Sequence, residues 1–119
     1  MATQITHIVF ADKIFNTLFP KRNKCAFFIG TCFPDIRYLT AIDREKTHLS
    51  DIKINNEDSD FLVGMKFHQI LDIVREKYIT KNGIYKIIKP TEDNVRGIKL
   101  FEDRLFYSLI KNWQEYIQY

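Results

Sequence analysis

The segment from Gly64 to Asp72 contains the pair of residues best suited to metal or acid–base chemistry in this chain. It sets His68 and Asp72 four residues apart within a strongly apolar run that favours a helix. At that spacing two side chains share one helix face, with Cβ atoms about 5–6 Å apart. A buried carboxylate without a partner is strongly destabilising, so Asp72 needs one. Two partners remain open: a divalent metal bound jointly with His68, or a His68–Asp72 hydrogen bond inside the core.

The other candidate residues precede this segment. The chain has three histidines, and with two carboxylates they form an ordered pattern: Thr6-His7, Phe33-Pro34-Asp35-Ile36, Thr47-His48 and His68-x-x-x-Asp72. Taken alone, His7 beside Ile8 is more typical of a satisfied core or surface residue than of a metal ligand.

This ordered pattern resembles the zinc-dependent phospholipase C family, whose all-helical fold is shared with a group of zinc nucleases. The opening Ile5-Thr6-His7-Ile8-Val9-Phe10-Ala11, and the Phe28-Ile29-Gly30 that leads into Pro34-Asp35, are also similar to the N-terminal part of that family. The resemblance covers roughly residues 3 to 80. It implies hydrolysis of a phosphodiester, such as a phospholipid headgroup linkage, with zinc or another divalent metal as cofactor.

The resemblance also implies a set of metal ligands. One zinc of the family is held by two Asp and two His, which correspond to Asp35, His48, His68 and Asp72. His7 and Asp72 match ligands of a neighbouring metal. Imidazole nitrogens and carboxylate oxygens are good zinc ligands, and four of them from separate segments can close around one ion.

Two features of the sequence depart from the family. Its enzymes hold a further zinc through two later His and a Glu, whereas no His follows His68 here. Secreted members also use the amino group and carbonyl of a processed N-terminal Trp, whereas this chain begins Met-Ala-Thr. The chain is therefore either the front part of a longer protein or a reduced relative with one metal site.

Three functions are compatible with these observations: a phospholipase C-like hydrolase, a non-catalytic helical metal-binding interaction module, and a zinc nuclease-like enzyme. A site of two Asp and two His is already four-coordinate, as in structural zinc, whereas catalysis needs an open position. A second ion at His7 and Asp72 would restore such a position. We therefore expect weak or no phosphodiesterase activity from these 119 residues.

Apolar periodicity predicts an all-α fold, a small bundle around one central helix. The helices are expected over 3–18, 24–33, 59–79 and 92–116. Thr3, and either Ser59 or Asp60, are the expected N-caps of the first and the central helix. Residues 36–58 have no sustained period and predict a long irregular segment, of a length that usually has a role such as building a site. Residues 84–88 are β-prone and predict an extended connector.

Glu102 is the one carboxylate inside the apolar stripe of the last predicted helix. The stripe consists of Val95, Ile98, Phe101, Leu105, Leu109 and Trp113. Glu102 either escapes to the surface or points into the polar centre, as an outer acceptor for a ligand His or as a replacement ligand.

Length and composition indicate one globular domain. The 119 residues are 45% hydrophobic and 28% charged, which is ordinary for a folded domain. The net charge of +3 is spread along the chain, and it neither indicates nor excludes a nucleic-acid ligand. Cys25 and Cys32 are expected to be buried thiols. With no apolar run of about 18 residues and no N-terminal signal pattern, we expect no membrane span and a cytoplasmic location.

Overall fold

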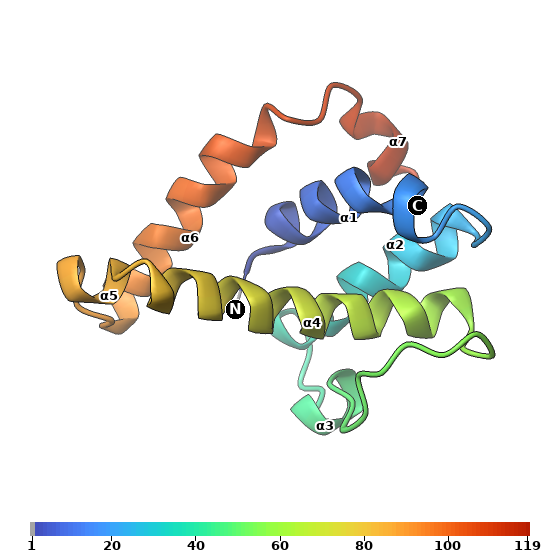
Figure 1. Cartoon of the computed structure of the whole chain (residues 1–119), viewed down its shortest axis with the longest axis horizontal. Coiled ribbons are helices and arrows are strands. Elements are labelled where there is room, and N and C mark those ends of the chain that lie inside the picture. Colours follow the sequence, from blue (N-terminus) through green and yellow to red (C-terminus); the bar gives the residue numbers. More distant parts are fainter. Residues whose placement is uncertain (1) are drawn as a thin grey trace.

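Every regular element within residues 2–119, the part of the chain that the computed structural model describes, is helical (Figure 1). The all-α prediction is therefore confirmed. In chain order the elements are α1 (Gln4–Leu18), α2 (Lys24–Cys32), the 3-10 helix η1 (Phe33–Tyr38), α3 (Arg44–Thr47), α4 (Asp60–Lys81), α5 (Ile84–Ile87), α6 (Glu92–Tyr107) and α7 (Trp113–Ile117). Within residues 2–119, no helix is both long and apolar enough to cross a membrane.

Side-chain caps set the starts of the three helices that build the core. The Thr3 hydroxyl accepts from the backbone N–H of Thr6 at the start of α1, and the Ser59 hydroxyl accepts from Leu62 at the start of α4. The Asn23 side chain does the same at the start of α2. Such caps satisfy backbone donors that have no partner inside the helix. The starts predicted at Thr3 and Ser59 are confirmed.

The core is an aromatic cluster where α1, α2 and α4 meet. Its buried residues are Ala11, Phe15, Phe27, Phe28, Val63, Phe67 and Leu71. Two glycines let the backbones of α2 and α4 approach closely. A Cβ at Gly30 would lie 2.0 Å from the Phe61 carbonyl oxygen, and one at Gly64 would lie 2.1 Å from that of Phe27. Only glycine fits at either position, and this crossing fixes α4 against the end of α2.

Two cations anchor the segment that leads into α4. The Arg22 guanidinium donates to the carbonyl oxygens of Asn55 and Asp58, at 3.1 and 2.7 Å. The buried Lys66 ammonium donates to the Lys53 carbonyl and to the Asp58 carboxylate, at 2.7 and 2.8 Å. Hydrogen bonds from these cations to backbone carbonyls, and the Lys66–Asp58 ion pair, thus hold the end of the predicted irregular segment 36–58. The segment begins inside η1, which differs from the prediction, and it contains one short helical turn, α3.

The C-terminal third of the chain requires three corrections. Residues 84–87, predicted as extended, form the helical turn α5, which follows Gly83 at φ 70°. The single helix predicted over 92–116 is divided into α6 and α7, because the Trp113 indole N–H donates to the Tyr107 carbonyl at 2.9 Å and its ring stacks on Tyr107. The predicted apolar stripe of this helix is largely exposed, with Phe101 61% and Leu105 51% accessible.

The two cysteines also differ from expectation. Both are free thiols, and each is partly exposed instead of fully buried.

Candidate metal centre

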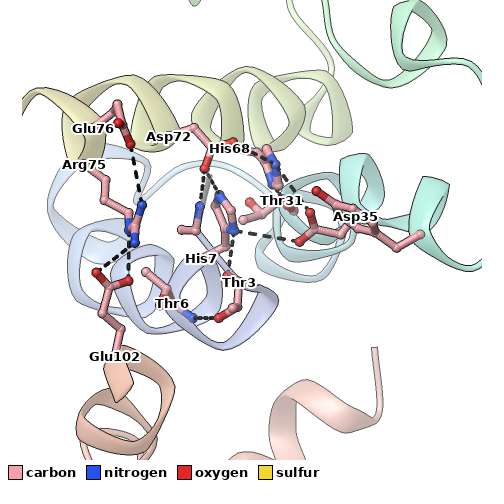
Figure 2. Close-up of polar contacts among 12 residues, drawn as sticks. Thr3, Thr6, His7, Thr31, Asp35, His68, Asp72, Arg75, Glu76 and Glu102 are labelled. Atoms are coloured by element: carbon pink, nitrogen blue, oxygen red, sulfur yellow. Dashed lines mark hydrogen bonds and ion pairs between the residues drawn. The ribbon is translucent and has the colours of Figure 1, made fainter. Parts of the chain in front are cut away.

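Four of the residues singled out from the sequence meet between α1, η1 and the middle of α4 (Figure 2). His7 comes from α1, Asp35 from η1, and His68 and Asp72 from successive turns of α4. One ligand atom each from His7, His68 and Asp72 lies within 4.8 Å of the other two. Asp35 lies just beside this group, with its oxygens 3.8 Å from His7 Nδ1 and from His68 Nε2.

The two histidine rings are held in the same way. They stack with centroids 3.7 Å apart and planes 8° from parallel. His7 Nδ1 lies 2.8 Å from the Thr3 carbonyl oxygen, and His68 Nδ1 lies 2.8 Å from the Thr31 carbonyl oxygen. A carbonyl oxygen only accepts, so each Nδ1 must carry a proton and donate it. In a neutral ring the inward-facing Nε2 is then an acceptor, the arrangement typical of metal-binding histidines.

Those Nε2 atoms face carboxylate oxygens, which also accept. His7 Nε2 lies 3.3 Å from Asp72 Oδ1, and His68 Nε2 lies 3.5 Å from Asp72 Oδ2. Charge-assisted hydrogen bonds between such groups are shorter, about 2.7–2.9 Å. Buried acceptors that face one another need a cation or an additional proton between them. Consistent with this, His7 Nε2 and Asp35 Oδ2 are buried and lack a hydrogen-bond partner in the described part of the chain.

Burial and neighbouring charges shift the pKa values of the site. Burial, reinforced by the adjacent His7, lowers the pKa of His68 to about 4. Burial raises the pKa of Asp35 to about 6, although His7 partly opposes this. Burial also acts to raise the pKa of Asp72, but its interaction with the adjacent His7 ring and the hydrogen bond from the Ala2 backbone outweigh it and hold that pKa below its usual range. His68 is therefore neutral and Asp72 ionised at pH 7, the forms that bind metals.

The residue before the first helix contributes to the site through its backbone. The Ala2 N–H donates to Asp72 Oδ1 at 2.7 Å, and Ala2 is buried. This bond, together with the Thr3 and Thr31 carbonyls, fixes the orientation of the ligands. None of these three backbone groups has a sequence signal as a site residue, because any residue type supplies the same atoms.

His48 lies next to the group and not within it. Its ring meets that of His68 edge-on, with centroids 5.8 Å apart, and its Nδ1 is 3.0 Å from the Thr47 hydroxyl. Its Nε2 is buried and unpartnered among residues 2–119. Burial, aided by the positive charges of Arg44 and Arg37, lowers the pKa of His48, so that it too is neutral at pH 7.

Glu102 takes neither of the two positions considered from the sequence, the surface or the polar centre of the site. Its two carboxylate oxygens accept from Arg75 Nε and Nη2, each at 2.9 Å, in a bidentate pair (Figure 2). Both side chains are largely buried, Arg75 at 9% and Glu102 at 17% accessible. Glu102 thus joins α6 to α4 and is neither free at the surface nor among the ligand atoms that lie within 4.8 Å of one another.

Comparisons with known proteins returned no match, whether against protein-family models, curated proteins or solved structures.

Proposed function

We propose that this chain is a divalent-metal-binding helical domain, with zinc as the ion and His7, Asp35, His68 and Asp72 as its ligands. The observation that carries the proposal is the arrangement of buried acceptors. Two ring nitrogens, oriented by their backbone carbonyls, face two carboxylates with no donor between them. A bound cation satisfies all of these atoms at once, whereas a core hydrogen-bond cluster needs an extra proton on one of the two stacked rings or on Asp35, whose pKa burial raises to about 6.

The distances between the candidate ligand atoms fit a small tetrahedral ion. Zinc binds nitrogen and oxygen at about 2.0–2.1 Å, which places tetrahedral ligand atoms about 3.3–3.4 Å from one another. The separations close to this value here are 3.3 Å from His7 Nε2 to Asp72 Oδ1, 3.5 Å from His68 Nε2 to Asp72 Oδ2 and 3.8 Å from His68 Nε2 to Asp35 Oδ1. Asp35 lies outside the group of His7, His68 and Asp72 whose ligand atoms are within 4.8 Å of one another, so binding of one ion by all four residues requires Asp35 to move inward. The set of two imidazoles and two carboxylates suits zinc better than calcium or magnesium, which prefer oxygen ligands.

Thermal unfolding of the purified protein with and without zinc tests this proposal. An ion that binds only the folded state, present at a hundredfold excess over Kd, stabilises it by about 2.7 kcal/mol. We expect zinc to raise the Tm and a chelator to reverse the effect. His68→Gln and Asp72→Asn, which keep side-chain volume, should each weaken zinc affinity by more than about tenfold.

The exposed Asp43 offers a matched control. Asp43→Asn removes the same charge away from the site and should leave the zinc response unaltered. A wild-type melting curve that ignores both zinc and chelator would mean that the four residues form a structural hydrogen-bond cluster. Adding His48→Gln to the set decides whether this neighbouring ring is a further ligand.

The related chemistry is phosphodiester hydrolysis, which the resemblance to zinc-dependent phospholipase C enzymes supports. A bound divalent ion would polarise a phosphoryl oxygen and lower the pKa of a bound water. The chain itself supplies orientation: backbone carbonyls of Thr3 and Thr31 aim the rings, and the Ala2 N–H holds Asp72. Four protein ligands leave a single ion no open position, so a non-catalytic metal-binding module is the competing proposal.

An assay with bis-p-nitrophenyl phosphate separates the two proposals. We expect weak or no turnover by these 119 residues, even with zinc bound. Robust, chelator-sensitive turnover that is lost in folded His68→Gln and Asp72→Asn proteins would establish a hydrolase instead. Parallel assays with a phospholipid and with single-stranded DNA distinguish a phospholipase C-like from a nuclease-like activity.

A further inference from the structure

A cavity of about 740 Å³ lies beside the metal centre, and no role has yet been assigned to it. One wall is formed by α1, α2 and η1, the other by α7 and the residues after it. The lining is mainly aliphatic and aromatic and includes Ile8, Phe28, Phe33, Trp113, Tyr116 and Ile117. Small-molecule sites have volumes of about 300–1,000 Å³ and apolar linings with a few polar groups. The cavity has both properties.

Two charged groups line this cavity, Asp35 and Lys99. Asp35 is shared with the metal centre, where His7 and His68 face it. Lys99, from α6, is half-buried, and its ammonium has no ion pair or hydrogen bond within residues 2–119. Its charge acts on Asp35 across the cavity, in the direction that lowers the pKa of that carboxyl. A lysine in the lining of an apolar cavity can form a charge-assisted hydrogen bond with the anionic group of a ligand.

We propose that this cavity binds a single-chain amphiphilic anion. The apolar chain of the ligand lies between the walls of α2 and α7, and its anionic head pairs with Lys99. Because Asp35 in the same lining is ionised at pH 7 and repels an anion, the head lies beside Lys99 and away from Asp35. A cationic head beside Lys99 is repelled by the ammonium. The inference does not require the metal, because the cavity and Lys99 belong to the protein itself.

The α7 wall can yield to admit such a ligand. None of its residues is buried. It is held by a hydrogen bond from the Tyr116 hydroxyl to Asp12, an ion pair between Lys24 and Glu115 at 2.8 Å, and contact of the Tyr116 ring with Phe28. Segments with few buried side chains open at a lower free energy than the core.

Fluorescence of Trp113 reports on the cavity, because it is the only tryptophan of the chain and lines the wall. Metal-free protein is titrated with decanoate, decanol and decyltrimethylammonium, which share a chain and differ in the charge of the head. We expect decanoate to bind roughly three- to tenfold more tightly than decanol, the range for pairing a partly exposed charge. The cationic amphiphile should bind most weakly.

Substitutions then distinguish the contribution of the ligand's head group to binding from that of its apolar chain. Lys99→Met should reduce decanoate affinity to that of decanol, while Lys111→Met, which removes an exposed charge outside the cavity, should change neither. Cys32→Phe and Ile36→Phe each fill the cavity and should abolish binding of both ligands. Using two filling variants, with circular dichroism as a check of folding, guards against one that fails to fold.

Equal binding of decanoate and decanol, an unaltered Lys99→Met protein, or wild-type binding by both folded filling variants would overturn the inference. Its outcome is distinguishable from that of the metal proposal. Zinc stabilisation without decanoate binding removes this inference alone, and decanoate binding without zinc stabilisation removes the metal proposal alone.

Discussion

Asp35 and His68 occupy the same buried site, and their pKa values are shifted in opposite directions. The pKa of Asp35 is raised and that of His68 is lowered. Burial disfavours the charged form of both groups. It therefore keeps His68 neutral, with a pKa of about 4, and makes Asp35 harder to ionise, with a pKa of about 6. At pH 7 the neutral histidine is ready to bind a metal. The ionised Asp35 is held in an unfavourable environment that a metal would relieve.

The strain at Asp35 predicts that Asp35→Asn stabilises the metal-free protein at pH 7. Because the folded pKa of about 6 exceeds the ordinary value of 3.8, the folded state keeps a proton that the unfolded state releases between about pH 4 and 6. The free energy of unfolding therefore falls as the pH rises through that window. Removing the carboxylate should recover about 1–3 kcal/mol at pH 7 and little at pH 4. Urea denaturation in chelator at both pH values measures the difference.

The same variant exposes the contribution of His68, which has the opposite sign. Its folded pKa of about 4 lies below 6.5, so the unfolded state binds more protons in between, and stability rises with pH over that range. The two contributions oppose each other in wild-type protein, whereas in Asp35→Asn only the rise remains. An Asp35→Asn protein that is less stable than wild type at pH 7, or equally shifted at both pH values, would contradict this account.

At the scale of the elements, the site depends on how closely α2 and α4 cross. Gly30→Ala would place a Cβ 2.0 Å from the Phe61 carbonyl oxygen, and neither backbone can yield without separating the helices. We expect a loss of about 1–3 kcal/mol or more, the range for overpacking. Zinc affinity should fall as well, because the crossing sets the Thr31 carbonyl against His68.

Gly97 provides the control for this prediction. It lies in α6, and a Cβ there would meet nothing within 4 Å. Gly97→Ala should raise stability by roughly 0.5–1 kcal/mol, since alanine is the better helix former. If both substitutions change the Tm by the same amount and in the same direction, close approach is not what fixes the crossing.

Glu102 is the element-scale link between α4 and α6. Glu102→Ala leaves the largely buried Arg75 guanidinium without its bidentate partner, which should destabilise the protein by about 2–4 kcal/mol. Arg75→Met with Glu102→Ala removes both charges and should recover part of that loss. We expect zinc affinity to be unaltered in the single variant. A tenfold or larger drop in a folded Glu102→Ala protein would instead assign Glu102 to the metal centre.

The sequence could predict those elements whose signals are local. Thr3 and Ser59 are caps, and they mark the starts of α1 and α4 directly. The break between α6 and α7 has no such mark, because Leu105, Leu109 and Trp113 continue a helical period with no Gly or Pro between them. The break accompanies the contact of Trp113 with Tyr107, six residues earlier, which a helical period cannot reveal.

The candidate site divides in the same way. The four-residue spacing of His68 and Asp72 predicts that they share one helix face. In the structure, His68 Nε2 lies 3.5 Å from Asp72 Oδ2. His7 and Asp35 were candidates only through the ordered pattern of the whole segment. The backbone groups that orient the rings, and Arg75 as the partner of Glu102, follow from three-dimensional packing and from no short sequence pattern.

At the scale of the whole molecule, the candidate metal centre and the C-terminal helices lie in parts of the fold that differ in burial. The core of α1, α2 and α4 contains the buried aromatic cluster, whereas α6 has no buried residue. In Figure 1, α6 rises from the far end of α4 beyond α5, and α7 returns to the α2 side. Besides the Arg75–Glu102 pair, α6 is attached by a hydrogen bond from Thr3 to Asp103 and by the edge-to-face contact of Phe10 with Phe106.

Native-state hydrogen exchange should therefore show two levels of protection. Local opening is favoured where few apolar side chains are buried, so amides of α6 and α7 should exchange at a lower free energy than those of α2 and α4. The proposed ligands of zinc lie on α1, η1 and α4, so zinc should increase protection there and leave α6 and α7 nearly unaltered. Decanoate should do the reverse at α7, because it occupies the cavity that α7 closes. Uniform protection along the chain, with one common response to zinc, would show instead that the C-terminal helices unfold only together with the core.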